Sequence, residues 1–478
     1  MTDHTLYESP LASRYASREM SALFSPYFKH LTWRKLWIAL AKSQKKLGLF
    51  ITDSQIAALE KHLPTIDFAA AATHEKKLRH DVMAHIHTYA DQCPEAGKIL
   101  HLGATSCFVT DNTDLIQMRE ALHLLQKKLL LVLRQLAVFA RKNKSLACLS
   151  YTHLQAAQPT TVGKRACLWL QDFLWDFHDL EEKLKHFPFL GLKGATGTQA
   201  SFLALFNGDA AKVKKLELLV AEEMGFVALF PISGQTYTRK QDMRILSLLT
   251  GMAASAHKCA TDLRLLAHLK EIDEPFDSHQ IGSSAMPYKR NPMRSERICG
   301  LSRFLISLNE NPTYTAATQW LERTLDDSAN RRLAISEAFL TADAVLNLLI
   351  NVTGDLIIYP QSIARHLREE LPFLALENIL MEMVKRGKDR QEIHERLRIH
   401  SQEAAKKMKE EGLPCDLLER ISRDKHFGLS LAEIEKMTHA EHFIGRAPEQ
   451  VEEFLCDQID PLLKRYEKVD LSPPKIDL

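Results

Sequence analysis

Apolar residues recur along much of the chain at steps of three and four, which is the spacing of one face of an α-helix. Between residues 115 and 139 these steps alternate strictly, at Leu115, Met118, Leu122, Leu125, Leu129, Val132, Leu136 and Phe139. A seam this regular predicts a long helix that packs against another long helix. Leu124, Leu131 and Leu133 lie off the seam, so we expect this helix to contact neighbours on more than one side.

Glycine and proline, the residues that most often end helices, are absent from several long stretches. The stretches that lack both are 104–158, 164–187, 235–250 and 313–353, and the third continues beyond Gly251 to residue 274. Strand patterns, in which apolar and polar residues alternate, are sparse. Together these features predict an all-α protein whose helices, several of them roughly 25 to 40 residues long, form an elongated bundle.

The helical pattern divides into three predicted domains. We expect residues 1–106 to form an N-terminal helical domain, residues 107–358 a central bundle of long helices, and residues 359–478 a C-terminal domain of shorter helices. A chain of 478 residues is long enough for about three domains. Wide apolar faces on long helices often pack against other copies of the same chain, so we expect an oligomer.

Composition and charge narrow the class of protein. Basic and acidic residues number 62 and 60, a net charge of +2, which argues against a protein that binds nucleic acid or a membrane surface. No apolar run approaches the roughly 20 residues that span a bilayer, and the first fifteen residues lack the apolar core of a secretory signal. The eight cysteines form no C-x-x-C pair, so we expect reduced thiols, no metal site and a cytoplasmic protein.

One short stretch, GSSAMPYKRNPMRSE at residues 282–296, carries more polar chemistry than the helical sequence around it. Its prolines stiffen it, and a new helix is predicted over residues 293–311. A loop that leads into a helix N-terminus offers free backbone N–H groups to an anion, and Lys289 and Arg290 add positive charge. A solvated basic connector is the alternative interpretation, and the residues alone leave both open.

Two further motifs precede the predicted central bundle. Arg79-His80-Asp81 is either a polar helix surface or a group of donors that faces a polar ligand. The spacing of the histidines from His80 to His87 does not place three imidazoles on one helical face, which disfavours a metal site. Gly103-Ala104-Thr105-Ser106 leads into the longest predicted helix, where its hydroxyl residues form either an ordinary N-cap or part of an anion site.

Three more motifs lie further along the chain. His153, in the stretch YTHLQ, is either a buried, hydrogen-bonded histidine or the acid or base of a cleft, because its charge changes near neutral pH. The stretch GLKGATGT at residues 191–198 lacks the ending of a phosphate loop and is interpreted as a tight turn near a ligand. In RTLDDSANRR, Ser328 and Arg332 share one helical face, which suits either a phosphate clamp or a salt-bridged surface.

Taken together, these motifs resemble a known superfamily. GSSAMPYKRNP matches the fumarase/aspartase signature G-S-S-x-M-P-x-K-x-N-P at every fixed position, and GATS and YTHLQAAQPTT resemble the two other conserved regions of that superfamily. Within it, SPLASRYAS, LRHDVMAH, SGQTYTRK and RTLDDSANRR resemble the adenylosuccinate lyase family, and Tyr288 resembles its animal-type branch. The resemblance extends from about residue 9 to at least residue 380, and more loosely to the C-terminus.

This resemblance implies an all-α homotetramer with a multi-helix core, in which three chains contribute to each active site. It also implies the β-elimination of fumarate from adenylosuccinate, which gives AMP, and from SAICAR, which gives AICAR, in purine nucleotide biosynthesis. In that reaction a base removes a proton next to a carboxylate, negative charge builds on the carboxylate, and an acid protonates the departing nitrogen. The family implies no metal and no redox cofactor.

The resemblance also assigns catalytic roles. Ser283 is the expected base, with Ser284 as an alternative that the sequence leaves open, and His153 is the expected acid. Lys289 is expected to hold a succinyl carboxylate, and Glu296 to orient the acid or the lysine. The residues implied to bind substrate are Arg14, Tyr15, Arg79, His80, Asp81, Thr105, Ser106, Thr152, Gln235, Asn291, Arg297, Arg323, Ser328 and Arg332.

Two rival interpretations follow from the same motifs. One is another lyase of the superfamily, such as argininosuccinate lyase or fumarase. The arginine-containing stretches SPLASRY (residues 9–15) and RTLDDSANRR (residues 323–332) argue against it, because they suit a phosphorylated substrate. The other is a non-catalytic helical scaffold of the same fold, which the presence of Ser283, His153 and Lys289 disfavours.

Overall fold

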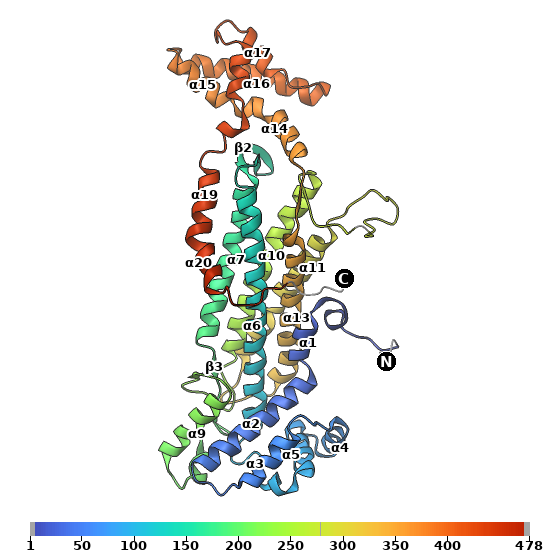
Figure 1. The fold of residues 1–478 in the computed structure, drawn as a ribbon, viewed down its shortest axis with the longest axis vertical. Coiled ribbons are helices and arrows are strands. Elements are labelled where there is room, and N and C mark those ends of the chain that lie inside the picture. The colour runs from blue at the N-terminus through green and yellow to red at the C-terminus, as the bar shows by residue number, and fades with distance from the viewer. Residues whose placement is uncertain (1–4, 278, 473–478) are drawn as a thin grey trace.

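In the computed structural model, which describes residues 5–277 and 279–472, the chain is elongated and almost entirely helical (Figure 1). Long helices run side by side through its middle and form a bundle, which confirms the predicted all-α fold with a central long-helix bundle. The bundle helices are α6 (Ser106–Lys142), α7 (Val162–Lys185), α10 (Lys240–His268), α11 (Met293–Leu308) and α13 (Asp326–Gly354).

The N-terminal helices α2 to α5 cover one end of the bundle, at the bottom of Figure 1. Their starts follow local signals: Ser25 accepts a hydrogen bond from the backbone of Phe28 and Pro26 occupies the first turn of α2, as expected of a helix N-terminus. The elements of this region are η1 (Leu11–Tyr15), α1 (Arg18–Leu23), α2 (Pro26–Lys46), α3 (Asp53–His62), α4 (Phe68–Leu78), α5 (Asp81–Gln92) and η2 (Pro94–Ile99).

The opposite end of the bundle carries a β-hairpin and a group of shorter helices (Figure 1). The hairpin strands, β1 (Ala147–Thr152) and β2 (Gln155–Thr161), are antiparallel and pack against α14. The helices beyond the hairpin, which bury a small core of their own around Ile379, Met383 and Phe427, are α14 (Pro360–Leu374), α15 (Leu376–Lys385), α16 (Arg390–Glu411), α17 (Leu417–Arg423) and α18 (Leu431–Met437).

Short elements complete the fold. Two of the three sheets pair distant segments: β3 is parallel to β4, and β5 is antiparallel to β6. The remaining elements are β3 (Pro188–Phe189), α8 (Ala200–Leu205), α9 (Ala210–Glu223), β4 (Ala228–Leu229), β5 (Ile272–Asp273), α12 (Glu310–Thr318), β6 (Ile357–Ile358), η3 (Ala440–His442), α19 (Ala447–Phe454), η4 (Leu455–Ile459) and α20 (Asp460–Arg465).

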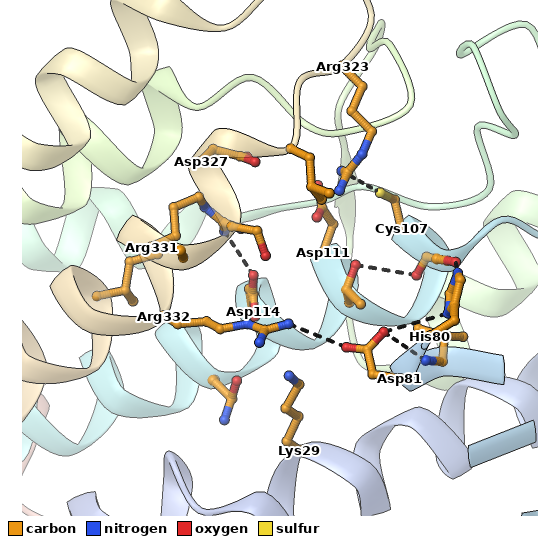
Figure 2. Close-up of a pocket in the computed structure, with 18 of the residues that line it drawn as sticks. Lys29, His80, Asp81, Cys107, Asp111, Asp114, Arg323, Asp327, Arg331 and Arg332 are labelled. Atoms are coloured by element: carbon orange, nitrogen blue, oxygen red, sulfur yellow. Dashed lines mark hydrogen bonds and ion pairs between the residues drawn. The ribbon is translucent and has the colours of Figure 1, made fainter. Parts of the chain in front are cut away.

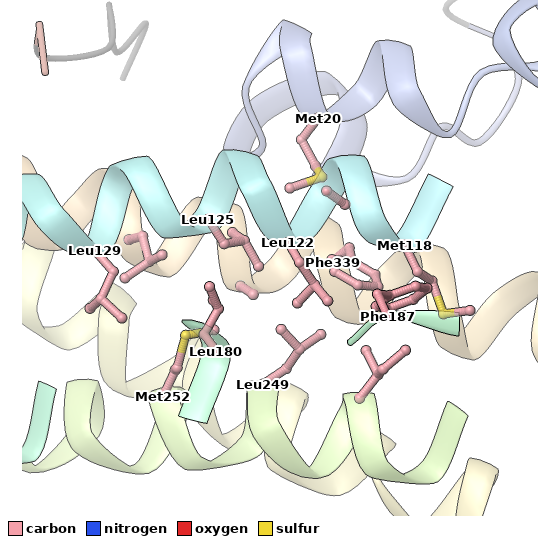
Figure 3. Close-up of a cluster of buried hydrophobic side chains, with 14 of the residues drawn as sticks. Met20, Met118, Leu122, Leu125, Leu129, Leu180, Phe187, Leu249, Met252 and Phe339 are labelled. Atoms are coloured by element: carbon pink, nitrogen blue, oxygen red, sulfur yellow. The ribbon is translucent and has the colours of Figure 1, made fainter. Parts of the chain in front are cut away.

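The predicted apolar seam lies in the core of the bundle. Leu122, Leu125 and Leu129 of α6 have no exposed surface and face Leu249 and Met252 of α10 (Figure 3). Of the residues off the seam, Leu131 and Leu133 are also buried and Leu124 is half-buried, which confirms that α6 has neighbours on more than one side. Truncation of such a buried leucine to alanine costs about 2–5 kcal/mol, so this seam contributes strongly to the stability of the bundle.

Two of the stretches without glycine or proline are not continuous helices. Helix α6 ends at Lys142 and the chain continues into the hairpin, while α12 and α13 are separated by residues 319–325. In the hairpin, backbone pairing between β1 and β2 replaces the helical hydrogen bonds. Absence of glycine and proline permits a helix but does not require one, because packing partners decide between alternatives of similar propensity.

The predicted domain limits fall close to element boundaries. Helix α6 begins at Ser106 and α14 begins at Pro360. Beyond α18, however, the chain returns along α7, where Val451, Leu455 and Ile459 join the core of the bundle. The division into three domains stays a prediction.

Contrary to the sequence-based expectation, one helix within the described residues, α13, is long and apolar enough to cross a membrane, but 78% of its most apolar window is buried within the fold. A core helix of a bundle has this character, because it is surrounded by apolar neighbours on all sides.

Candidate active site

A cavity of roughly 990 Å³ lies where the first turns of α5, α6 and α13 approach α2 (Figure 2). Five separate segments of the chain contribute to its wall, within residues 24–30, 75–82, 105–117, 235–239 and 323–336. Half of the residues that the sequence pattern implicates line this one cavity, namely Arg79, His80, Asp81, Thr105, Ser106, Gln235, Arg323, Ser328 and Arg332.

The turn between α4 and α5 presents Arg79, His80 and Asp81 to the cavity. Arg79 ends α4 in the left-handed region, with a φ of 54°, and this reversal lets His80 cap α5. His80 Nδ1 accepts a hydrogen bond from the backbone N–H of Met83 (3.3 Å). Its Nε2 atom therefore carries the proton and lies 3.4 Å from the hydroxyl of Ser106.

The start of α6 supplies hydroxyl groups. Thr105 occupies the N-cap position, as predicted, but its side chain makes no capping hydrogen bond. The hydroxyl of Thr105 is therefore available to a ligand, and the positive end of the helix dipole favours an anion there. The sequence left two interpretations open, an ordinary N-cap and an anion site. In the structure Thr105 occupies the N-cap position, but its side chain makes no capping hydrogen bond.

The start of α13 places Ser328 and Arg332 on the cavity wall, as the helical spacing predicted. Arg332 Nη2 approaches Asp81 Oδ2 of α5 at 3.4 Å, and Figure 2 shows the two side chains pointing toward each other across the cavity. The side chain of Arg332 is 63% exposed. A loose, exposed pair of this kind contributes little to stability and leaves Arg332 free to bind another anion.

Beneath the cavity, Arg239 at the start of α10 is fixed by two carboxylates. Its Nε donates to Asp327 Oδ2 at 2.7 Å and its Nη1 to Asp111 Oδ2 at 2.9 Å. All three side chains are at most 2% exposed. Arg239 thus ties α10 to α6 and α13, and its charge is balanced within the protein.

Arg331 forms a second buried centre beside the first. It donates to Asp242 Oδ2 at 2.7 Å and to the hydroxyl of Tyr237, and it forms an ion pair with Asp114 Oδ2 at 2.8 Å. Burial raises the pKa of Asp114, although Arg331 opposes this. These two paired arginines form a rigid floor, so they orient the segments above them and are not themselves available to a ligand.

Arg323 is held differently. Its Nη1 donates to the thiol sulfur of Cys107 at 2.9 Å, and that thiol donates to Gln235 Oε1 at 3.4 Å. Burial raises the pKa of Cys107 to about 12, so the thiol stays neutral at physiological pH. Arg323 consequently keeps its full positive charge for a ligand while its orientation is set.

Some residues of the cavity wall carry no sequence signal, and two of them are neighbours on α2. Lys29 and His30 follow one another on α2, and neither belongs to a motif that the sequence analysis identified. Figure 2 shows the ammonium of Lys29 directed into the cavity. Burial lowers the pKa of His30 to about 3, so this imidazole is neutral and Lys29 adds a cation to Arg79, Arg323 and Arg332.

The loop that carries Ser283 lies away from this cavity and projects from the side of the bundle (Figure 1). Within it, Ser283 Oγ accepts hydrogen bonds from the backbone N–H groups of Ala285 (3.3 Å) and Met286 (3.1 Å). Asn291 donates to the carbonyl of Gly282 at 2.8 Å, and Lys289 is exposed. The loop leads into α11 at Met293, as predicted.

Thr152 and His153 lie on the β1–β2 hairpin, at the end of the bundle opposite to α5 (Figure 1). Thr152 pairs with Gln155, so His153 and Leu154 form a two-residue turn. Their φ angles of 53° and 57° match a turn in which both central residues are left-handed. His153 is exposed in the single chain, unlike the buried histidine that was the alternative interpretation.

The remaining predicted residues gather near the start of α11. The guanidiniums of Arg14 and Arg297 lie over the ring of Tyr15, at 5.9 Å and 5.7 Å from its centre. Glu296 is exposed on the first turn of α11. Within one chain, the predicted residues therefore occupy four places: the cavity, the Ser283 loop, the hairpin turn, and this cluster of Arg14, Tyr15 and Arg297.

The described residues, 5–277 and 279–472, contain no group of three or more His, Cys, Asp or Glu side chains placed to hold a metal ion. The eight cysteines are free thiols. The cavity instead combines guanidinium, ammonium, hydroxyl and amide groups, which suits a ligand with several negative charges.

Comparison with known proteins gives consistent results along the whole chain. A family model described as "Lyase" matches residues 44–305, and one described as "Adenylosuccinate lyase C-terminus" matches residues 372–454. The chain is 51% identical to a Saccharomyces cerevisiae protein over 98% of each chain, and 50% identical to a Schizosaccharomyces pombe protein over 100% of each. A Pyrococcus abyssi protein is 32% identical over 93% of this chain and 96% of its own. All three are named adenylosuccinate lyase.

Solved structures share the fold at lower identity. A 3-carboxy-cis,cis-muconate lactonizing enzyme from Pseudomonas putida has a TM-score of 0.81 at 21% identity, covering 96% of this chain and 99% of its own. A fumarate lyase from Mesorhizobium has a TM-score of 0.78 at 22% identity, covering 95% and 100%. The motifs, the cavity and the full-length relatives agree, and the chain belongs to the adenylosuccinate lyase family of carbon–nitrogen lyases, within the fumarase/aspartase superfamily.

Proposed function

We propose that this protein eliminates fumarate from adenylosuccinate, giving AMP, and from SAICAR, giving AICAR. The observation that carries the proposal is the cavity in which Arg79, Arg323, Arg332 and Lys29 surround hydroxyl and amide donors. Adenylosuccinate bears a phosphate and two carboxylates. These cations, of which only Arg332 has a carboxylate partner, the loosely placed Asp81, match that set of charges together with the neighbouring donors. Family membership supports the same substrates.

We also propose that the active site is completed by other copies of the chain. His153 and the Ser283 loop lie on elements remote from the cavity wall, and His153 is exposed in the single chain. A homotetramer in which three chains meet at each site brings a hairpin and a loop from neighbours to the cavity. Exposed apolar residues on the bundle helices, such as Trp175 and Leu333, supply surface for that assembly.

In this site Ser283 is the base that removes the proton next to a carboxylate. Two backbone N–H groups point at its Oγ and stabilise negative charge on that oxygen, which is what a serine needs to act as a base. The same contacts favour Ser283 over Ser284. His153, on a neighbouring chain, protonates the departing nitrogen, and Lys289 and Asn291 hold the carboxylates on which charge builds.

The phosphate binds to arginines from more than one place in the fold. Ser328, Arg323 and Arg332 lie on the cavity wall, and the cluster of Arg14, Tyr15 and Arg297 is brought to it by a neighbouring chain. Guanidinium groups suit a dianionic phosphate because they donate two parallel hydrogen bonds. Thr105, Ser106, Thr152 and Gln235 are the remaining donors to the succinyl group, and Glu296 orients the acid or the lysine.

An ultraviolet assay on the purified protein tests this function. We expect fumarate and AMP from adenylosuccinate, and no fumarate from argininosuccinate or malate. Ser283→Ala should lower kcat by about 10²–10⁴-fold, the usual contribution of a positioned general base, while Ser284→Ala retains most of the activity. Turnover of argininosuccinate instead, or unchanged turnover in Ser283→Ala, contradicts the proposal. If the protein releases fumarate from none of the three compounds, the result favours the scaffold interpretation.

A further inference from the structure

The base of the Ser283 loop is closed by one buried carboxylate. Glu274, which ends the segment before the loop, is 6% exposed. Its Oε1 accepts the backbone N–H of Arg294, and its Oε2 accepts the backbone N–H and the hydroxyl of Ser295, each at 2.9 Å. The two ends of the loop, twenty residues apart in the chain, are thus joined by three hydrogen bonds to a single side chain.

These contacts replace a helix cap. The N-cap position of α11 is Pro292, which provides no side-chain hydrogen bond, so the first free N–H groups of the helix need another acceptor. Glu274 supplies it from outside the helix, and its negative charge faces the positive end of the helix dipole. Because Ser295 is fully buried, water does not replace the carboxylate cheaply.

Arg294 reinforces the same junction from the helix side. Its guanidinium, on a residue that is 7% exposed, donates to the carbonyl of Pro275 at 2.6 Å and to Asp277 Oδ2 at 2.6 Å. The backbone of Arg294 binds Glu274 while its side chain binds the first residues of the loop. The start of α11 is therefore locked to the start of the loop through both groups.

A second closure lies nearer the tip. Asn291 donates to the carbonyl of Gly282 at 2.8 Å, and a β-carbon at Gly282 would lie 2.0 Å from the carbonyl oxygen of Lys289. Gly282 is required here because the two sides of the loop approach so closely. The exposed tip from Ser283 to Arg290 is consequently connected to the bundle through a narrow neck and the base at Glu274.

We propose that Glu274 is a positioning residue for catalysis, which fixes the base of the loop and thereby the placement of Ser283, Lys289 and Asn291. This proposal rests on the proposed function of that loop. Glu274 does not touch substrate in this account. It acts by holding α11 and the loop in one geometry, so its loss misplaces the base during turnover more than it weakens nucleotide binding at the cavity wall.

Glu274→Gln is the direct test, because it keeps size and polarity. The amide offers only one acceptor oxygen and directs an NH₂ group at a backbone N–H, so one of the two helix contacts is lost. Ser295→Ala is the second variant: it removes the hydroxyl contact and keeps both backbone contacts. The matched control is Glu310→Gln, which changes an exposed glutamate in the first turn of α12.

The structural measurement is amide hydrogen exchange of the native, full-length assembly at the start of α11. We expect the amides of Arg294 and Ser295 to lose about 10-fold or more of their protection in Glu274→Gln, with a smaller loss in Ser295→Ala. Protection in α13 and in Glu310→Gln should match the wild type. Unchanged protection of Arg294 and Ser295 in Glu274→Gln overturns the proposal, whatever the enzyme acts on.

The functional measurement is steady-state kinetics on adenylosuccinate. Glu274→Gln should lower kcat by about 10–100-fold with KM within about 3-fold of wild type, while Ser295→Ala loses less. A rise in KM with unchanged kcat contradicts a positioning role. A wild type that is inactive on adenylosuccinate refutes the proposed function, and the exchange result still decides whether Glu274 closes the loop. If Glu274→Gln does not fold, Ser295→Ala becomes the test. We then expect smaller losses of amide protection and of kcat in this variant. Amide exchange and kinetics equal to those of the wild type would overturn the proposal.

Discussion

At the scale of single residues, the character of the cavity follows from which cations have a carboxylate partner. Arg239 and Arg331 are balanced by buried aspartates, so they serve as structure. Arg323 is bound to a neutral thiol and Arg332 to a loosely placed Asp81, so their charges remain available. The cavity therefore attracts an anion even though the chain as a whole is almost neutral.

Arg332 provides a first prediction at this scale. Arg332→Met should raise KM for adenylosuccinate by about 10–100-fold, because a charged hydrogen bond to phosphate is lost, with a much smaller effect on a dephosphorylated analogue. Steady-state kinetics on both compounds measures the difference. Arg368→Met, which removes an exposed arginine of α14, should change neither value. An equal loss with and without the phosphate would exclude a phosphate role for Arg332.

Asp176 of α7 provides a pH-dependent prediction. Burial raises the pKa of its carboxyl to about 7, whereas an unfolded aspartate titrates near 3.9. The folded state therefore binds the proton more tightly than the unfolded state. As the pH rises from about 4 to 7, ionisation of Asp176 lowers the free energy of unfolding. Asp176→Asn should raise the melting temperature at pH 8 and change it little at pH 4. Calorimetry at pH 4 and pH 8 measures the change in melting temperature. A larger increase at pH 4 than at pH 8 would contradict the raised pKa of Asp176.

Residues with a motif were predictable, and residues placed only by packing were not. Ser328 and Arg332 could be put on one face because helical spacing is fixed by geometry, and the structure puts both on the cavity wall. Lys29 and Cys107 reach the same wall from positions that look like ordinary helical sequence. Nothing in a local pattern reports that α2 crosses the start of α6, since that contact depends on the tertiary arrangement.

At the scale of elements, the bundle helices were the most predictable part of the fold. The alternating seam of α6 is buried along its length, because a periodic apolar face has a large free-energy incentive to be covered. The hairpin was not predicted, since its strands lie in a stretch that also permits a helix. It forms where α6 has ended and α14 covers one of its sides, which is tertiary context.

The hairpin turn offers a prediction about strain. Leu154 is 74% exposed and holds a left-handed φ of 57°, which costs a non-glycine residue about 1–2 kcal/mol. Leu154→Asn should raise the free energy of unfolding by about 0.5–1 kcal/mol, because asparagine tolerates this conformation. Leu154→Ala, which keeps the strain, should not. Thermal unfolding of the three proteins compares them, and a gain in Leu154→Ala alone would argue against strain at this turn.

At the scale of the whole molecule, the single chain presents its chemical groups in separate places. The cavity lies at one end of the bundle, the hairpin turn at the other, and the Ser283 loop projects from the side (Figure 1). An antiparallel assembly of elongated bundles brings opposite ends of neighbouring chains together. The tetramer with shared sites proposed above would account for both the shape of the chain and the distribution of its predicted site residues.

Exposed apolar residues of the bundle give a prediction for this assembly. Trp175 of α7 is 64% exposed and lies seven residues, or two helical turns, after Leu168, which is 50% exposed. Trp175→Glu should break the tetramer into smaller species and abolish activity, because a buried unpaired charge at an interface is strongly unfavourable. Sedimentation velocity measures the mass of the assembly. Leu413→Glu, which lies beyond the bundle, is the control and should leave the tetramer intact. An intact tetramer in Trp175→Glu would mean that Trp175 is not at the interface.

Subunit complementation tests the central claim most directly. His153→Ala and Ser283→Ala, each of which should have little activity alone, are mixed, dissociated and allowed to re-form tetramers, and fumarate release from adenylosuccinate is measured. If the two residues of one site come from different chains, some mixed sites contain both intact, and activity returns in proportion to the fraction of hybrid tetramers. A mixture of Ser283→Ala with the Ser283→Ala/His153→Ala double variant is the control and should stay inactive. Re-formed hybrid tetramers of the first mixture that show no activity above this control would contradict the shared site.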